Sequence, residues 1–265
     1  MLESTRGVGW NEVLVLDMAS EPAVRMEDGI TWLRSESNLG PAAGRNRLAD
    51  AATSDILVFL DDDAILLTPT MSGVVDLFER DQQLGLVAFQ IHREDGRITS
   101  AEYPFRGPVR GADRSRPCAY FVAAGYACRR DAIRGVGGYD ELLVIYGEEL
   151  ELSFNLARAG WELKYFPEVS VEHKPSPKGR TSARAYWPNT MRNRCIVARK
   201  YLPVTVGVIH LACWAVLTGA HSVTAGGLGL WLKEVVAGMR MPIARRPLAW
   251  NQLRRLHALG GRVLW

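Results

Sequence analysis

The pattern of apolar and polar residues predicts three elements in the first two thirds of the chain. Residues 56–60 form an apolar run whose length and β-branched content are typical of a buried strand. Residues 148–159 place apolar side chains at helical spacing ahead of Gly160, which predicts an amphipathic helix that ends at this glycine. Residues 169–173 alternate between apolar and polar side chains, which predicts a short strand. Each of these elements carries acidic residues or a histidine at one end.

Three consecutive aspartates, Asp61, Asp62 and Asp63, directly follow the first predicted strand. Carboxylates this close together repel one another, and a divalent cation between them is the simplest way to remove the repulsion. Oxygen ligands favour Mg²⁺ or Mn²⁺, which commonly complete their coordination with phosphate oxygens of a substrate. An acidic turn after a strand is the alternative interpretation. The triplet therefore indicates a cation site only in combination with other residues.

Two further groups could complete such a site. Glu148, Glu149 and Glu151 lie in the first turn of the predicted helix, where acids also favour the helix dipole without any other purpose. His173 ends the predicted short strand and is either a metal ligand or a structural histidine. The choice depends on whether the chain brings these residues together.

The C-terminal third differs in charge from the rest of the chain. From Lys174 onward there are fifteen Lys or Arg residues and one acid, Glu234, so this part carries +14 and the preceding part −11. Such a division indicates an anionic partner surface. A nucleic acid is not favoured as that partner, because aromatic residues are not interleaved with the basic ones as a stacking platform requires.

An apolar segment interrupts the basic third. Residues 201–232 contain no Asp, Glu, Lys or Arg, and this length could span a bilayer. Basic residues flank the segment on both sides, which argues against a single crossing. Glycines at 226, 227 and 229 could divide it into two helices that lie in the cytoplasmic leaflet, with basic residues meeting lipid headgroups. The alternative is a helical pair packed on the rest of the chain.

Composition limits the other choices. At 265 residues the chain can hold one α/β domain and an appendage. Its four cysteines show neither metal-finger nor redox spacing, and residues 1–9 do not have the pattern of a signal peptide, so we expect a cytoplasmic protein. The Gly-rich basic opening loop of a nucleotidyltransferase is absent. Asp63 is followed by Ala64 and Ile65 rather than by the Gly-Thr of the phosphatases that use an aspartate triplet.

Taken in order, several segments resemble those of the family 2 glycosyltransferases. The segments lie at residues 11–20, 38–46, 61–63, 137–141, 147–149 and 171–173. The resemblance covers roughly residues 11–174, and this many ordered segments are improbable by coincidence. It implies a GT-A fold, that is, a Rossmann-like mixed sheet flanked by helices, here with a C-terminal helical, membrane-associated extension. The family's usual first strand, with its Pro-containing loop, has no counterpart in residues 1–10.

The resemblance also implies roles for individual residues. Asp17 would contact the nucleobase, and Arg45 would lie near the ribose or phosphates. Asp61 and Asp62 would contact the nucleotide. The cation would be Mg²⁺ or Mn²⁺, and its ligands would be Asp61, Asp63 and His173. The general base would be Glu149, where the family usually has an aspartate, with Glu148 or Glu151 as alternatives. Phosphate or acceptor contacts would come from Glu148, Arg180, Arg184 and Arg192.

The predicted organisation is a GT-A-like catalytic domain over residues 1–185 and a basic, apolar helical extension over residues 186–265. The predicted function is metal-dependent, inverting transfer of a sugar from a nucleotide-diphosphate donor to a hydroxyl of a glycan, a lipid-linked glycan or a metabolite. The predicted location is the cytoplasmic face of a membrane. The alternative is a noncatalytic GT-A remnant that binds a membrane or a partner.

Overall fold

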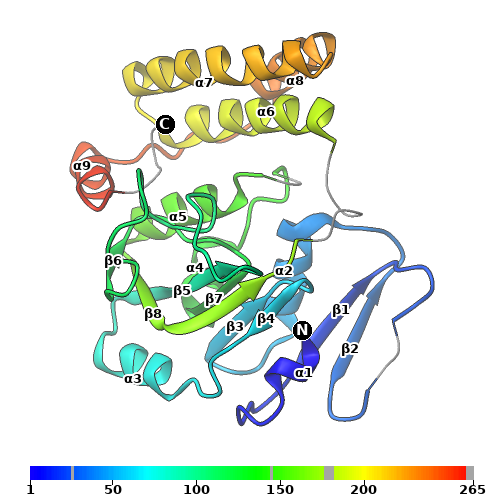
Figure 1. The fold of residues 1–265 in the computed structure, drawn as a ribbon. Helices are drawn as coiled ribbons and strands as arrows, with labels where there is room; N and C mark the ends of the chain where they lie inside the picture. The colour runs from blue at the N-terminus through cyan, green and yellow to red at the C-terminus, as the bar shows by residue number, and fades with distance from the viewer. Residues whose placement is uncertain (25–26, 144–145, 176–181, 261–265) are drawn as a thin grey trace.

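The computed structural model describes residues 1–24, 27–143, 146–175 and 182–260. Strands and helices are mixed up to residue 173, and the elements described after it are helices (Figure 1). The strands are β1 (Leu14–Met18), β2 (Thr31–Ser35), β3 (Ile56–Leu60), β4 (Ala64–Leu66), β5 (Leu84–Arg93), β6 (Arg116–Cys118), β7 (Gly125–Arg129) and β8 (Glu162–His173). The helices are α1 (Leu2–Thr5), α2 (Gly40–Ala51), α3 (Ser72–Arg80), α4 (Arg130–Val136), α5 (Glu148–Ala159), α6 (Ala183–Tyr201), α7 (Val204–Thr224), α8 (Leu228–Arg240) and α9 (Trp250–Ala258).

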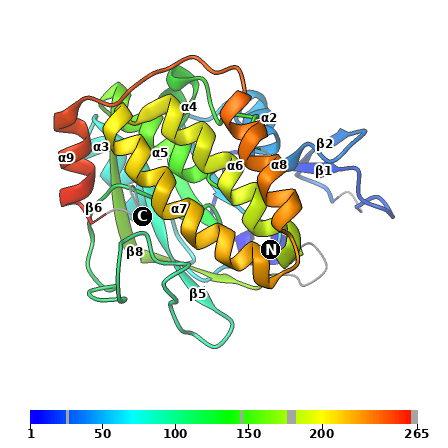
Figure 2. The same cartoon turned by 90° about the horizontal axis from the view of Figure 1, so that it is seen from above.

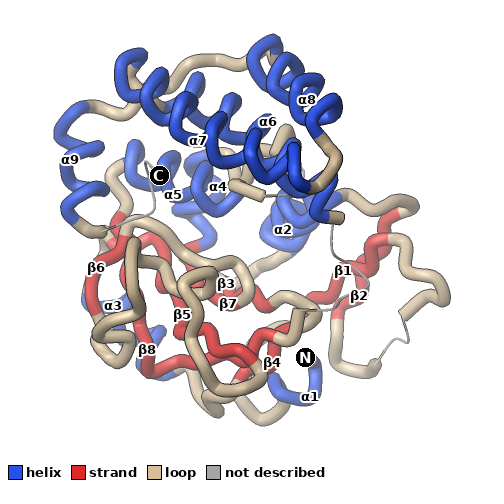
Figure 3. The backbone as a smooth tube through the Cα atoms, turned by 45° about the horizontal axis from the view of Figure 1, so that its top comes forward, coloured by secondary structure: helices blue, strands red, loops and turns tan. Residues whose placement is uncertain are grey.

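The main sheet is mixed and has the strand order β3-β7-β5-β8-β4, with β6 paired to β8. The β5 and β8 strands are parallel, and the other pairs in this sheet are antiparallel. The β1 and β2 strands form a separate parallel pair at one side of the molecule (Figure 3). The run at 56–60 is a strand, as predicted, whereas the strand predicted at 169–173 is longer and begins at Glu162. A register shift opposite Phe89 and Gln90 lets β8 continue past the proline at 167.

Buried side chains lie on both faces of the main sheet and again under the C-terminal helices. One core cluster joins β3, β7 and β8 to α2, α4 and α5, and a second joins the sheet to α3. A third cluster contains Phe154 of α5, Ile196 and Tyr201 of α6, and Leu253 of α9. Burial of these apolar surfaces fixes α5 between the sheet and α6. The start of α5 therefore has a defined position over the ends of the strands.

The α6, α7 and α8 helices lie together as a layer over α5 (Figure 2). The apolar segment is divided, as predicted, because α7 ends at Thr224 and α8 begins at Leu228. Gly226 lies at this break and has a φ of 66°, a conformation that suits glycine. α6 runs continuously across residue 185, so the proposed division of the chain at that position stays a prediction.

An apolar cavity of about 430 Å³ separates β1 from β3. Its lining comes from the N-terminal residues, from β1 and β3, and from α3, and it includes Val8, Trp10, Leu14, Val58 and Val74. Neither β1 nor β3 has a paired strand on the side that faces this space, among the pairs formed by the described residues. The two-stranded sheet and the main sheet are thus separated where the expected first strand has no counterpart.

Candidate functional site

The turn between β3 and β4 carries the aspartate triplet, and the pairing of β4 with β8 brings His173 beside it. Ala64 is the register partner of His173, and the Lys174 N–H donates to the Asp63 carbonyl at 2.8 Å. The His173 Nε2 atom consequently lies 3.4 Å from Asp63 Oδ1. Single ligand atoms of Asp61, Asp63 and His173 all lie within 4.8 Å of one another. Residues separated by more than a hundred positions therefore share one small space.

This group of three fits a divalent cation. Its spacing is close to that required by one ion with ligand bonds of about 2.1 Å. The hydrogen bond with Asp63 raises the pKa of His173, since the carboxylate stabilises a positive charge on the ring. Desolvation, followed by the charges of Asp63 and Asp61, raises the pKa of Asp62. A cation bound here would offset this concentration of negative charge.

Arg45 connects the aspartate turn to the start of α5. Its Nη2 atom lies 2.6 Å from Asp61 Oδ1, and its Nη1 atom lies 3.8 Å from Glu148 Oε1. Burial opposes the charge of Arg45, but the combined effect of Asp61, Tyr139, Tyr126 and Glu148 outweighs burial and raises the pKa of Arg45. Arg45 therefore stays charged and holds α2, β3 and α5 in one arrangement.

The three glutamates of α5 have different surroundings, which separates their roles. Glu151 is buried, and its Oε1 atom accepts hydrogen bonds from Lys200 Nζ at 2.8 Å and from the Tyr201 hydroxyl. Glu148 faces Arg45, whereas Glu149 forms no salt bridge within the described part of the chain. Burial raises the pKa of both Glu148 and Glu149. Of the three acids, Glu149 is the one without a salt bridge to a lysine or arginine among the described residues.

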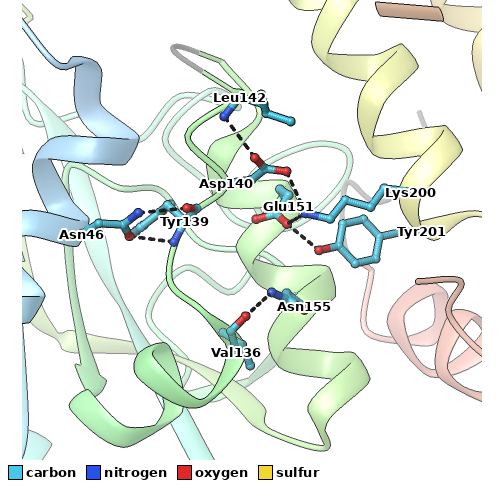
Figure 4. A network of polar contacts seen from close by, with 9 residues as sticks. All are labelled: Asn46, Val136, Tyr139, Asp140, Leu142, Glu151, Asn155, Lys200 and Tyr201. Atoms are coloured by element: carbon cyan, nitrogen blue, oxygen red, sulfur yellow. Dashed lines mark hydrogen bonds and ion pairs between the residues drawn. The ribbon is translucent and has the colours of Figure 1, made fainter. Parts of the chain in front are cut away.

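A polar network holds Tyr139 and Asp140, in the segment at 137–141 that precedes α5 (Figure 4). The Tyr139 N–H donates to Asn46 Oδ1 at 2.8 Å, and the Asn46 amide donates to the Tyr139 carbonyl at 2.9 Å. Lys200 Nζ bridges Asp140 Oδ2 at 2.7 Å and Glu151. This network explains Glu151 as a structural residue, so the alternative that it acts as the base is not favoured by the geometry.

Two residues other than glycine that lie near the site have left-handed backbone conformations. Within the described residues, positive φ values outside glycine occur at Ala19, with φ 60°, and Tyr146, with φ 71°. Ala19 follows Asp17, and Tyr146 precedes Gly147, the N-cap of α5. Such conformations cost free energy and tend to occur at functional positions. Ala19 lies in the segment at 11–20 and Tyr146 directly precedes the segment at 147–149, so both conformations occur at segments that the sequence analysis identified.

The predicted nucleotide residue Asp17 is already engaged. Its Oδ1 atom accepts a hydrogen bond from the Ser20 N–H at 2.9 Å, and its Oδ2 atom pairs with Arg34. The hydrogen bond from Ser20 lowers the pKa of Asp17. Asp17 is thus ionised and held in place, and its contact with a nucleobase stays a prediction.

Of the predicted phosphate ligands, Arg184 and Arg192 lie within the described residues and have different surroundings. Arg180 lies outside the described residues, and Arg184 is exposed near the start of α6. Arg192 donates to the Leu142 carbonyl at 2.9 Å and lies 4.0 Å from Glu234. The head group of Arg192 therefore holds the loop before α5 to α6 and α8, and its role toward phosphate stays a prediction.

Sequence analysis missed Arg194. Its guanidinium carbon lies 4.0 Å from the centre of the Trp214 ring, and its charge interacts with Tyr120, Tyr186 and Glu149. Tyr186 and Arg194 are eight residues apart on α6, which separates them by about 80° around the helix axis. That spacing was the available signal, and it could not reveal the proximity of Glu149 on another helix.

Comparison with known families and proteins gives concordant matches. Residues 12–136 match the model of the family described as glycosyl transferase family 2. The pre-mycofactocin glycosyltransferase of Mycobacterium tuberculosis H37Rv is 32% identical over 284 residues, covering 100% of this chain and 58% of the relative. The N-acetylglucosaminyl-diphospho-decaprenol L-rhamnosyltransferase of the same species is 24% identical over 203 residues, covering 63% of this chain and 66% of that protein. The chain thus spans less than two thirds of each relative.

Solved structures show the same fold at low sequence identity. Residues 1–349 of Staphylococcus aureus TarS, in complex with UDP-GlcNAc, match with a TM-score of 0.59 at 14% identity, covering 98% of this chain and 78% of that one. GalNAc-T7 with UDP, GalNAc and Mn²⁺ matches with a TM-score of 0.57 at 16% identity, covering 86% and 49%. The mixed sheet with flanking helices is accordingly the GT-A fold.

Proposed function

Because residues 12–136 match the model of glycosyl transferase family 2, we propose that the protein is a metal-dependent, inverting glycosyltransferase that uses a nucleotide-diphosphate sugar. The observation that carries this proposal is the convergence of Asp61, Asp63 and His173. The start of α5, with Glu149, is connected to this group through Arg45. A site of this kind contains both a place for a diphosphate and a base for an acceptor.

On the donor side, the departing diphosphate gains negative charge as the glycosidic bond breaks. Mg²⁺ or Mn²⁺ held by Asp61, Asp63 and His173 would stabilise that charge. Asp17 would orient the nucleobase, while Asp62 and Arg45 would lie along the nucleotide. Arg45 Nη2 also lies 2.6 Å from Asp61 Oδ1 and balances part of the negative charge there. A diphosphate leaving group stabilised in this way needs no proton donor, so one carboxylate is enough for the rest of the reaction.

On the acceptor side, Glu149 takes the proton from the attacking hydroxyl. A carboxylate within hydrogen-bond reach typically accelerates such a step by about 10² to 10⁴-fold. The raised pKa of Glu149 improves it as a proton acceptor once it is ionised. Direct attack on the face of the sugar opposite the diphosphate inverts the anomeric configuration, and NMR of the product's anomeric proton tests this.

Calorimetry with uridine, thymidine and guanosine diphosphates in the presence of Mn²⁺ tests the donor site. We expect one of these nucleotides to bind, with metal removal or Asp63→Asn weakening it at least tenfold. Asp76→Asn, an exposed change on α3, serves as the matched control and leaves binding unchanged. If none of the three nucleotides binds, the noncatalytic alternative, a GT-A remnant that binds a membrane or partner, replaces the enzyme.

We also propose that the protein lies on the cytoplasmic face of a membrane, with α7 and α8 as the contact surface. α7 is long and apolar enough to cross a membrane. A helix on a protein surface usually buries its apolar side and exposes its polar side, and α7 does the opposite. His210, Thr218 and Ser222 are buried, while the outward side chains are apolar. The large exposed apolar residues on the two helices are Val204, Val208, Ile209, Val216, Leu217, Val223, Leu228, Leu232, Val236 and Met239.

Charge and geometry favour contact in the plane of the membrane over a crossing. α7 packs along α6, and the Trp231 indole of α8 donates to Thr218 of α7 at 2.8 Å, so the two helices form one surface. Lys233 and Arg240 are exposed on α8, where they can meet anionic headgroups. An apolar face with a basic margin suits an interfacial helix.

A further inference from the structure

The side chain of Arg194 lacks the partners that a buried charge normally has. Its Nη1 atom is buried without a hydrogen-bond partner. Within the described residues Arg194 forms no ion pair, and its guanidinium lies on the face of Trp214, 4.0 Å from the ring centre. Arg194 as a whole is partly buried, but its Nη1 atom is removed from water without gaining an acceptor, which costs free energy. Burial accordingly lowers the pKa of Arg194.

The position of Arg194 relative to the proposed base is defined by shared neighbours. The charge of Glu149 acts on both Arg194 and Tyr186, and Arg194 also acts on Tyr186. On its other side, Glu149 interacts with Arg45 and Asp61. Asn193, next to Arg194 on α6, donates from its amide to the Tyr146 carbonyl at 2.7 Å, directly before the N-cap of α5. Glu149 therefore interacts with Asp61 of the aspartate turn and with Arg194 of α6.

The surroundings of Arg194 restrict what can approach it. Tyr120 and Tyr186 are its polar neighbours, and Trp214 belongs to α7, whose outer face is apolar. Tyr186 also contacts Tyr146 at 4.5 Å and Trp187 at 4.8 Å between ring centres. Aromatic rings next to an unpaired guanidinium suit a ligand that has an oxyanion attached to an apolar or cyclic body.

We infer that Arg194 is an acceptor-binding residue that holds an oxyanion, phosphate or carboxylate, carried by the acceptor near its reacting hydroxyl. The inference rests on the proposed glycosyltransferase function and assigns the acceptor to an anionic class. The guanidinium fork matches either oxyanion with paired hydrogen bonds. The oxyanion supplies the counter-charge that Arg194 lacks, while the hydroxyl faces Glu149 on the side away from Asp61 and Asp63.

The donor diphosphate is the competing occupant of this site. The charges that act on His173 come from Asp63, Asp61 and Glu102, whereas those that act on Arg194 come from Tyr120, Tyr186 and Glu149. Asp61 and Asp63 thus act on His173, whereas Arg194 interacts with a different carboxylate, Glu149. Experiment can distinguish the two ligands. If Arg194 binds the donor diphosphate, replacing Arg194 weakens nucleotide binding.

Binding of octyl phosphate, octanoate and octanol to the full chain, measured by calorimetry, tests the inference. We expect the phosphate or the carboxylate to bind, and the tighter of the two identifies the oxyanion. Arg194→Met should weaken that binding about tenfold or more and leave octanol unaffected. Arg254→Met, an exposed change on α9, is the matched control and should bind like the unaltered chain.

Two further measurements exclude a structural role. Removing an unpaired buried charge should leave the melting temperature of Arg194→Met unchanged or raised, and Arg194→Lys should recover part of the binding. Nucleotide diphosphate binding with Mn²⁺ should be the same in Arg194→Met as in the unaltered chain. Failure of both anions to bind, equal binding by Arg194→Met, or loss of nucleotide binding in that variant would overturn the inference. If no nucleotide binds the unaltered chain but an anion binds through Arg194, the proposed function fails while the anion site stands.

Discussion

The Nη2 atom of Arg45 lies 2.6 Å from Oδ1 of Asp61, and this ion pair ties α2 to the end of β3. The same guanidinium approaches Glu148 on α5, so a single cation sits between the proposed metal ligand and the helix of the proposed base. The relationship explains how two acidic segments come close without a prohibitive repulsion.

Replacing Arg45 should therefore damage both folding and the site. Arg45→Met leaves Asp61 and Glu148 without their counter-charge, and we expect a loss of about 2 kcal/mol in the free energy of unfolding. Denaturant titration measures this loss. Arg47→Met, an exposed change on the same helix, should cost much less, and equal losses in the two variants would contradict the assigned role of Arg45.

Activity should depend on the ionisation of Glu149. Burial raises the pKa of this carboxyl, and the base must be deprotonated, so kcat should rise with pH through a range above that of an ordinary glutamate. Glu149→Gln should lower kcat by about 10² to 10⁴-fold and remove this rise. Glu149→Asp should keep part of the activity. A rise that persists in the Gln variant would assign it to a different group.

Lys200 should contribute to stability rather than to chemistry. Its ammonium group bridges Asp140 and Glu151, and Glu151 is 1% exposed. Lys200→Met leaves a buried carboxylate unpaired, which typically costs about 3 to 5 kcal/mol. Thermal unfolding measures the loss, and Arg240→Met, at the exposed end of α8, is the control. Full stability with lost nucleotide binding in Lys200→Met would contradict this assignment.

The α7 surface should govern attachment to lipid. Val208 is 63% exposed and Val216 is 75% exposed, so a double change to Asp alters the outer face with little effect on packing. We expect Val208→Asp/Val216→Asp to stay in the supernatant when anionic vesicles containing phosphatidylglycerol are sedimented, whereas the unaltered chain pellets. Val75→Asp on α3, at the opposite side of the molecule, is the control (Figure 1). Equal sedimentation of the double variant would refute the proposed surface.

Local pattern was sufficient for the elements that carry the acids. The run at 56–60 and the helix before Gly160 were predicted correctly, because strand and helix periodicities are properties of neighbouring residues. The break of the apolar segment near Gly226 was also predicted, since glycine favours the left-handed conformation found there. The GT-A fold was implied by the resemblance of the ordered segments to the family 2 glycosyltransferases.

Contacts between distant segments could not be obtained in this way. His173 reaches Asp63 through the register of β4 on β8, and Glu151 is removed from the candidate bases by Lys200 and Tyr201 of α6. Arg194, rather than Arg192, approaches Glu149, and α7 turns its polar side inward. These relationships depend on which surfaces bury one another across the whole molecule, and that choice is made by packing free energy summed over many distant contacts. Residues close together in the sequence contribute only a small part of this packing free energy, so local patterns do not show which distant segments pack together.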